Sequence, residues 1–217
     1  MGRKTMNNKL QKRDCDIKIK LTPSGAQFLH FEMDIQGDHL DFLPASTMGE
    51  QFGAIVSACY MLFHEWGDMH EEWRKGGRLS WQDPNLHTIY SSVDWDNEGD
   101  VMEIIMSRSG NFEIDYENDM MEIVIKHYDD IIKKYKVKSK DWCYAIAKAC
   151  TEVIKEYGIY GYRCSTEGDG FLIHQLLYIK SFALGNFEAR ELIAENELDW
   201  AKRTSFEKEL ELLLFDM

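Results

Sequence analysis

Apolar and polar residues alternate with a period of two in the first part of the chain, at positions 16–21 and 27–35. This period is typical of half-buried strands. Gln36, Gly37 and Asp38 predict a tight turn into a further strand at 39–43, so we expect a hairpin. One face of the strand at 27–35 is apolar throughout and carries Leu29, Phe31, Met33 and Ile35.

A helical period follows the hairpin. Thr47 and Glu50 have the spacing of a capping box, which predicts the start of a helix, and Gly67 can end it. The apolar positions recur at helical spacing and are Phe52, Ile55, Val56, Cys59, Leu62, Phe63 and Trp66.

The stretch from Leu86 to Glu122 is predicted to form a β-meander. Its candidate strands are 86–95, 101–107 and 112–116, separated by turns at Asp96–Gly99 and Ser109–Asn111. Clean alternation on the third strand implies one face on a core and one face in water.

From Asp119 the pattern changes, and a helix to about Tyr135 is the favoured interpretation because the i, i+3, i+4 stripe is long. Asp119 and Glu122 have capping-box spacing. A strand with Met121, Ile123 and Ile125 on one face stays open as the alternative.

Helical patterns continue to the end of the chain. We expect helices at 142–157, ended by Gly158, and at 171–184, ended by Gly185; two further amphipathic segments lie at 187–201 and 205–215.

Strands followed by helices predict an α+β fold. In it, an antiparallel sheet, made of the N-terminal hairpin and the central meander, packs with a capped helix and a C-terminal group of helices. The expected organisation is a basic flexible tail at 1–13 and a single domain at 14–217, strand-rich to about 118 and helical from about 119.

The composition indicates in which cellular compartment the protein is found. Hydrophobic residues make up 44% of the chain, enough for a core, yet no apolar run is long enough to span a membrane. The N-terminal residues lack the apolar region of a secretory signal. Five cysteines without a CxxC pair suit a reducing compartment, so a cytoplasmic protein is predicted.

Charge is concentrated in the meander. The chain carries −13, and residues 94–122 hold ten acids and one base, Arg108. Such a surface repels nucleic acid and anionic membranes and attracts a cationic protein. Solubility alone is the simpler explanation. The candidate partner-binding residues are Asp94, Trp95, Asp96, Glu98, Asp100, Glu113, Asp115 and Glu117; Trp95 could instead point into the core.

No motif for chemistry stands out. Asp94, Asp96 and Glu98 resemble the first half of a calcium-binding loop, but Ile105 occupies the position that needs a bidentate Glu. The histidines lack metal-site spacing, and no nucleophile or phosphate-loop motif occurs. We therefore predict no catalytic residues, no metal site and no cofactor.

The hairpin from Phe28 to Phe42, the capped helix from Met48 and the segment SVDWDNEGDVMEIIMSRSGNFEIDYEND weakly resemble small acidic α+β immunity proteins of bacterial polymorphic toxin systems. The resemblance covers roughly the first half of the chain and transfers no individual binding residue. It implies a protein that neutralises a co-encoded toxin by covering its active surface.

The sequence thus predicts a non-enzymatic protein whose acidic meander binds a cationic partner, such as a toxin domain. Two alternatives stay open. One is an enzyme with a site assembled from dispersed residues. The other is a structural subunit that uses the amphipathic segments between Phe187 and Phe215, which exposed apolar stripes would favour. The pattern defines no oligomeric state.

Overall fold

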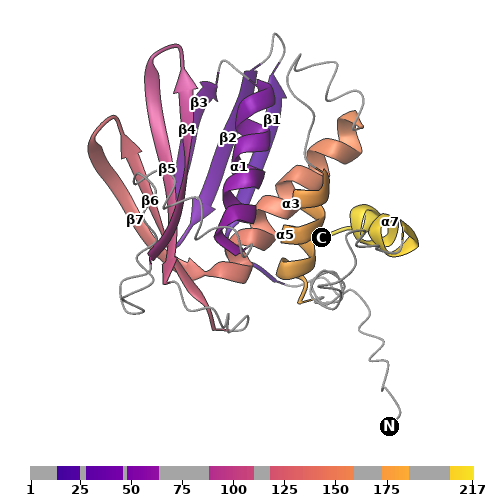
Figure 1. The fold of residues 1–217 in the computed structure, drawn as a ribbon. Helices are drawn as coiled ribbons and strands as arrows, with labels where there is room; N and C mark the ends of the chain where they lie inside the picture. Colours follow the sequence, from indigo (N-terminus) through magenta and orange to yellow (C-terminus); the bar gives the residue numbers. More distant parts are fainter. Residues whose placement is uncertain are drawn as a thin grey trace, which may run out of the picture.

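The computed structural model describes residues 14–24, 28–45, 48–63, 88–109, 118–158, 173–185 and 206–217. The predicted α+β fold is confirmed (Figure 1), and its strands form two antiparallel sheets, one with the N-terminal hairpin and one with the first two meander strands. Four predicted features lie outside the described residues: the N-terminal tail at 1–13, the capping residue Thr47, the third meander strand at 112–116 and the segment at 187–201.

The first sheet contains β1 (Lys18–Ser24), β2 (Phe28–Ile35) and β3 (Asp38–Ala45) in that order. The predicted hairpin is confirmed: Ile35 pairs with Asp38 across a two-residue turn, in which Gln36 and Gly37 both have positive φ. A turn of this kind matches the twist of the flanking strands.

The second sheet contains β4 (Thr88–Asn97), β5 (Asp100–Ser109), β6 (Met120–His127) and β7 (Asp130–Lys138), each antiparallel to the next. The first two strands and their turn were predicted. In the register, Val93 lies opposite Ile104, and Ile104 lies opposite Ile125. Side chains of alternate residues on these strands therefore share one buried face.

The prediction of a helix from Asp119 to about Tyr135, and of helical structure from about 119 onward, is wrong. This stretch is the β6–β7 hairpin, and the helix that follows it begins at Ser139. The alternative strand was correct, since Met121, Ile123 and Ile125 are buried. Consecutive β-branched residues favour a strand, and pairing with β5 buries a face that an isolated helix could not cover.

The described helices are α1 (Met48–Phe63), α3 (Ser139–Tyr157), α5 (Ile173–Ala183) and α7 (Phe206–Leu214), close to the predicted ranges. Gly158 ends α3 with φ at 71° and donates its N–H to the carbonyl of Ile154. In Figure 1, α5 and α7 lie on the side away from the second sheet, α3 runs from the end of β7 towards them, and α1 runs beside the strands.

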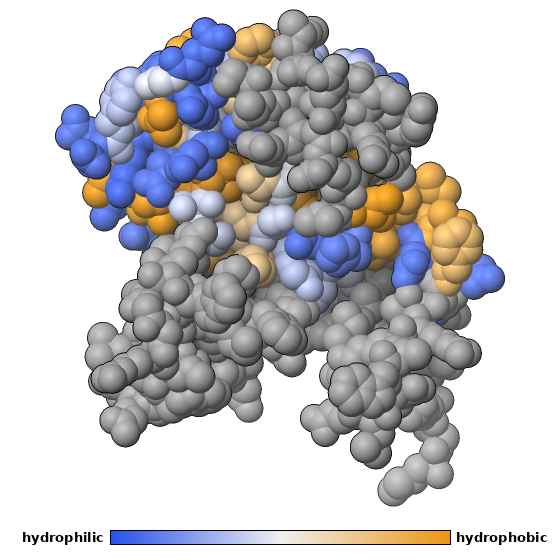
Figure 2. All heavy atoms as spheres, turned by 45° about the horizontal axis from the view of Figure 1, so that its top comes forward, coloured by the Kyte–Doolittle hydropathy of each residue, from blue (hydrophilic) through white to orange (hydrophobic). Residues whose placement is uncertain are grey.

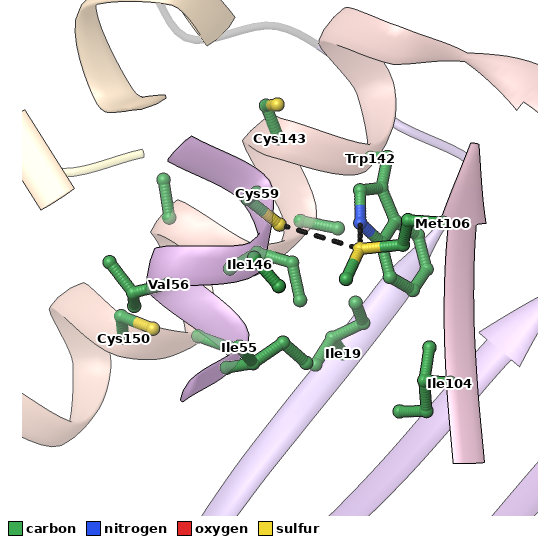
Figure 3. Close-up of a cluster of buried hydrophobic side chains, with 14 of the residues drawn as sticks. Ile19, Ile55, Val56, Cys59, Ile104, Met106, Trp142, Cys143, Ile146 and Cys150 are labelled. Atoms are coloured by element: carbon green, nitrogen blue, oxygen red, sulfur yellow. Dashed lines mark hydrogen bonds between the residues drawn. The ribbon is translucent and has the colours of Figure 1, made fainter. Parts of the chain in front are cut away.

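One hydrophobic core joins both sheets to the helices. α1 contacts β2, β4 and β5, and α3 contacts β1 and β7. At the centre, Met106 accepts hydrogen bonds at Sδ from Trp142 Nε1 at 3.2 Å and from Cys59 Sγ at 3.8 Å (Figure 3). These contacts fix the second sheet against the helices.

Candidate functional site

A buried ion pair holds the end of the second sheet. Arg108 on β5 donates to both carboxylate oxygens of Asp119, at 3.3 and 3.2 Å, and to the carbonyl of Leu62 near the end of α1. Asp119 also accepts hydrogen bonds from the hydroxyl of Ser139 and, at its carbonyl, from the Ser139 N–H. Asp119 therefore does not start a helix of its own; it contacts Ser139, the first residue of α3, whose N-cap position is Lys138.

At the opposite end of the sheet lie the acids predicted to bind a partner. Asp94 and Glu98 are exposed, and Asp96 and Asp100 are half-buried. An oxygen of the Asp96 carboxylate accepts the N–H of Gly99 at 2.8 Å, which holds the β4–β5 turn. The structure therefore places these four acids on one hairpin, while Glu113, Asp115 and Glu117 lie outside the described residues.

Trp95 belongs to the core and not to this surface. Its side chain is 1% exposed, and its Nε1–H donates to the carbonyl of Leu43 at 2.9 Å. The Trp95 ring packs against Phe31 and Phe42 of the first sheet. The predicted role of Trp95 as a partner contact is therefore wrong, and the alternative, that Trp95 points into the core, is correct. From the core, Trp95 anchors the acidic hairpin.

The β6–β7 hairpin brings bases to the acidic one. Lys126 pairs with Glu103 at 3.5 Å, and His127 pairs with Asp100. Residues 88–109 and 118–138 together contain nine acids and six bases, counting Asp, Glu, Lys and Arg. The described sheet is therefore less acidic than the stretch 94–122, and its acids concentrate on β4–β5.

The turns of the two hairpins touch each other. Tyr128, in the β6–β7 turn, donates its N–H to the carbonyl of Val101 at 3.1 Å and its hydroxyl to the carbonyl of Gly99 at 2.8 Å. We call residues 96–101 and 127–132 the paired tips; they lie at the upper left in Figure 1. Sequence reasoning missed Tyr128, because the helix prediction removed the turn that exposes it.

The surface there is mixed in character. Figure 2 shows hydrophilic side chains at the upper left of the molecule, interrupted by separate hydrophobic ones. The exposed apolar residues of the paired tips are Tyr128, Ile131 and Ile132.

Two further histidines lie on the outer face of the first sheet. His30 pairs with Asp41, and His39 Nδ1 lies 2.7 Å from Asp34. The hydrogen bond to Asp34 raises the pKa of His39. Among the described residues, no group of three His, Cys, Asp or Glu side chains has the arrangement of a metal site.

The buried thiols are poor nucleophiles. Burial raises the pKa of Cys59 to about 12 and raises the pKa values of Cys143 and Cys150 well above the ordinary value. A thiol that stays protonated neither attacks an electrophile nor binds a metal readily. All three pack as small hydrophobic residues between α1 and α3 (Figure 3).

Comparisons with protein-family models, with curated proteins and with solved structures find no match for this chain. In the described part of the chain, no helix combines the length and the apolar character needed to cross a membrane. The function has to be inferred from this chain's own residues.

Proposed function

We propose that this protein is a non-enzymatic binding protein of the immunity type, which recognises a cationic partner through its acidic hairpin. The observation that carries the proposal is the gathering of Asp94, Asp96, Glu98 and Asp100 on β4–β5. Complementary charge speeds association and selects the partner.

The hairpin is held rigidly enough to act as a docking element. Trp95 fixes β4 to the first sheet through its ring contacts and the Leu43 hydrogen bond. Arg108 fixes the far end of β5 through Asp119. A surface that is already ordered loses little conformational entropy when a partner binds.

The test uses the protein encoded immediately upstream of this chain's gene, co-expressed with the chain. Co-purification and restored growth of a host poisoned by that protein support the proposal. Replacing Asp94, Asp96, Glu98 and Asp100 by neutral amides should weaken binding at least tenfold, because the positive partner loses its complement.

A matched control changes net charge equally on other exposed positions: Asp14→Asn, Asp16→Asn, Glu152→Gln and Glu156→Gln. We expect this control to bind like the wild type. Equal weakening by both variants would mean that overall charge, not the hairpin, attracts the partner. Absence of any complex with the upstream protein would contradict the immunity role.

One observation favours a second candidate, a structural subunit of a larger assembly. Phe206, Leu210 and Leu214 repeat every four residues on α7 and are exposed, and Figure 2 shows hydrophobic side chains on that side of the molecule. Sedimentation of the wild type and a Leu210→Ser, Leu214→Ser variant tests it. A concentration-dependent assembly that the variant lacks would support this candidate.

A further inference from the structure

We propose that Tyr128, Ile131 and Ile132, which we call the apolar tip, form the contact centre for a cationic partner that presents an apolar surface. This inference rests on the proposed function and deepens it, because it names the side chains that supply affinity. Charge selects a partner, but buried aromatic and aliphatic anchors usually supply most of the binding energy.

The exposure of the apolar tip needs a reason. In the described part of the chain, seven large hydrophobic side chains are exposed, and three of them fall within residues 128–132. Tyr128 is 59% exposed, Ile131 52% and Ile132 44%, whereas Ile123 and Ile125 on the neighbouring strand are fully buried. Leaving large apolar side chains in water forgoes the stabilisation of burial.

Tyr128 is held in place before any partner arrives. Its backbone φ is 52°, a conformation that a bulky residue rarely adopts and that costs on the order of 1 kcal/mol. Its hydroxyl is bonded to Gly99, and its ring lies 4.6 Å from that of His127. A fixed aromatic side chain loses little rotamer freedom on binding.

The charges around the apolar tip define the partner. The paired tips contain five acids, Asp96, Glu98, Asp100, Asp129 and Asp130. Two of the nearby bases already have acidic partners, since Lys126 pairs with Glu103 and Lys133 pairs with Asp38. A lysine- or arginine-rimmed apolar surface fits this arrangement, whereas a second copy of the tip would bring like charges together.

The experiment titrates the ¹⁵N-labelled protein with two helical peptides of equal positive charge, one with a leucine face and one with a serine face. We expect the leucine peptide to bind at least tenfold more tightly and to shift amide signals within residues 96–101 and 127–132. Equal affinity for the two peptides, or shifts centred on α7, would overturn the inference.

A double variant, Ile131→Ser with Ile132→Ser, should reduce the affinity for the leucine peptide to that of the serine peptide. Leu214→Ser, which alters an exposed leucine elsewhere, should bind like the wild type. Unchanged binding by the double variant would also overturn the inference. An unchanged spectrum away from the tips shows that the double variant is folded. Tyr128→Ser is a second variant that tests the same loss of affinity for the leucine peptide independently.

The two proposals fail separately. If the upstream protein forms no complex while the peptide results hold, the immunity role is wrong and the apolar tip remains a binding surface. If the upstream protein binds but the leucine peptide shows no preference for the tips, the contact centre lies elsewhere.

Discussion

Two buried cations, at opposite junctions of the fold, are accommodated in different ways. Arg108 joins the second sheet to α1 and α3, and its charge is met by the carboxylate of Asp119. It also donates to the Leu62 carbonyl and lies over the ring of Phe63, with Cζ 5.4 Å from the ring centroid. The guanidinium thus has directed partners on several sides.

Lys180 joins α5 to the C-terminal segment without a carboxylate partner of this kind. Its ammonium donates to neutral oxygens: the hydroxyl of Thr151 at 3.2 Å and the carbonyls of Leu213 and Phe215 at 3.1 and 2.7 Å. Burial lowers the pKa of Lys180 to about 8; repulsion from Lys155 contributes, and Asp216 opposes the shift.

The two junctions differ because Arg108 carries a permanent charge, whereas the charge of Lys180 depends on pH. An arginine side chain stays charged at any pH at which proteins fold, so the Arg108 junction depends on keeping Asp119 as its partner. A lysine held by neutral oxygens can give up its proton. The C-terminal junction should therefore respond to pH near 8, and the sheet junction should not.

The largest effect should come from breaking the sheet junction. Asp119→Ala leaves the guanidinium of Arg108 buried without a counter-charge and is expected to cost about 3–5 kcal/mol of unfolding free energy. Urea unfolding monitored by circular dichroism measures this change. Glu122→Gln, which changes an exposed acid on β6, the strand that begins after Asp119, should alter stability by less than about 0.5 kcal/mol.

The double variant Arg108→Met, Asp119→Ala sharpens this result. Removing both charges should cost less than the sum of the two single changes, because neither charge is left buried alone. Additive single effects would mean that the pair is not coupled and would contradict the role given to Asp119.

The second prediction concerns pH and Lys180. The pKa of Lys180 is lowered on folding from its ordinary value of 10.5 to about 8, so the unfolded chain binds more protons between these values. Stability contributed by this group therefore rises as pH increases from 8 towards 10.5. Relative to Lys180→Met, the wild type should gain about 2 kcal/mol between pH 7 and pH 10.

The Met variant is the reference because tyrosines and thiols titrate in the same range in both proteins. Burial raises the pKa values of Tyr60 and Cys59, which lowers stability as pH rises. A pH-independent difference between wild type and variant would show that folding does not lower the pKa of Lys180.

An element of the fold could be predicted where the local sequence shows one clear hydrophobic period. The hairpin at β2–β3 and the helices ended by Gly158 and Gly185 have a single clear period, and they were predicted. Residues 120–135 satisfy two periods at once, because apolar residues occur at both spacings. Only pairing with β5, a contact between distant residues, decides for a strand.

The candidate functional site also has features that could be predicted from the sequence and features that could not. The acids of β4–β5 could be predicted because charge is visible in the sequence. The exposure of Tyr128 depends on a turn, and the role of Lys180 depends on backbone carbonyls at Leu213 and Phe215, which leave no signature in side-chain identity. The prediction that Asp119 caps a helix starting there is wrong, because its carboxylate instead accepts the hydroxyl of Ser139, which lies twenty residues later in the sequence.

A third prediction weakens the sheet junction without removing a charge. Ser139→Ala deletes the hydroxyl, at the start of α3, that donates a hydrogen bond to the Asp119 carboxylate. We expect a loss of about 1–2 kcal/mol in unfolding free energy, less than for Asp119→Ala. Ser139→Thr keeps the hydroxyl and should recover part of the loss. A larger effect than that of Asp119→Ala would show that packing, not the ion pair, dominates this junction.

The smallest effect tests the exposed surroundings of Lys180. Lys155 and Asp216 form an exposed ion pair at 2.9 Å, and such pairs contribute at most about 1 kcal/mol. Their opposite influences on Lys180 are more informative. Asp216→Asn removes a charge that raises the Lys180 pKa, so the pH at which stability begins to rise should fall; Lys155→Gln should move it upward. Urea unfolding of both variants across pH 7–10 measures the pH at which stability begins to rise in each. If this pH moves in the same direction in both variants, the two side chains act on the C-terminal junction through packing rather than through charge.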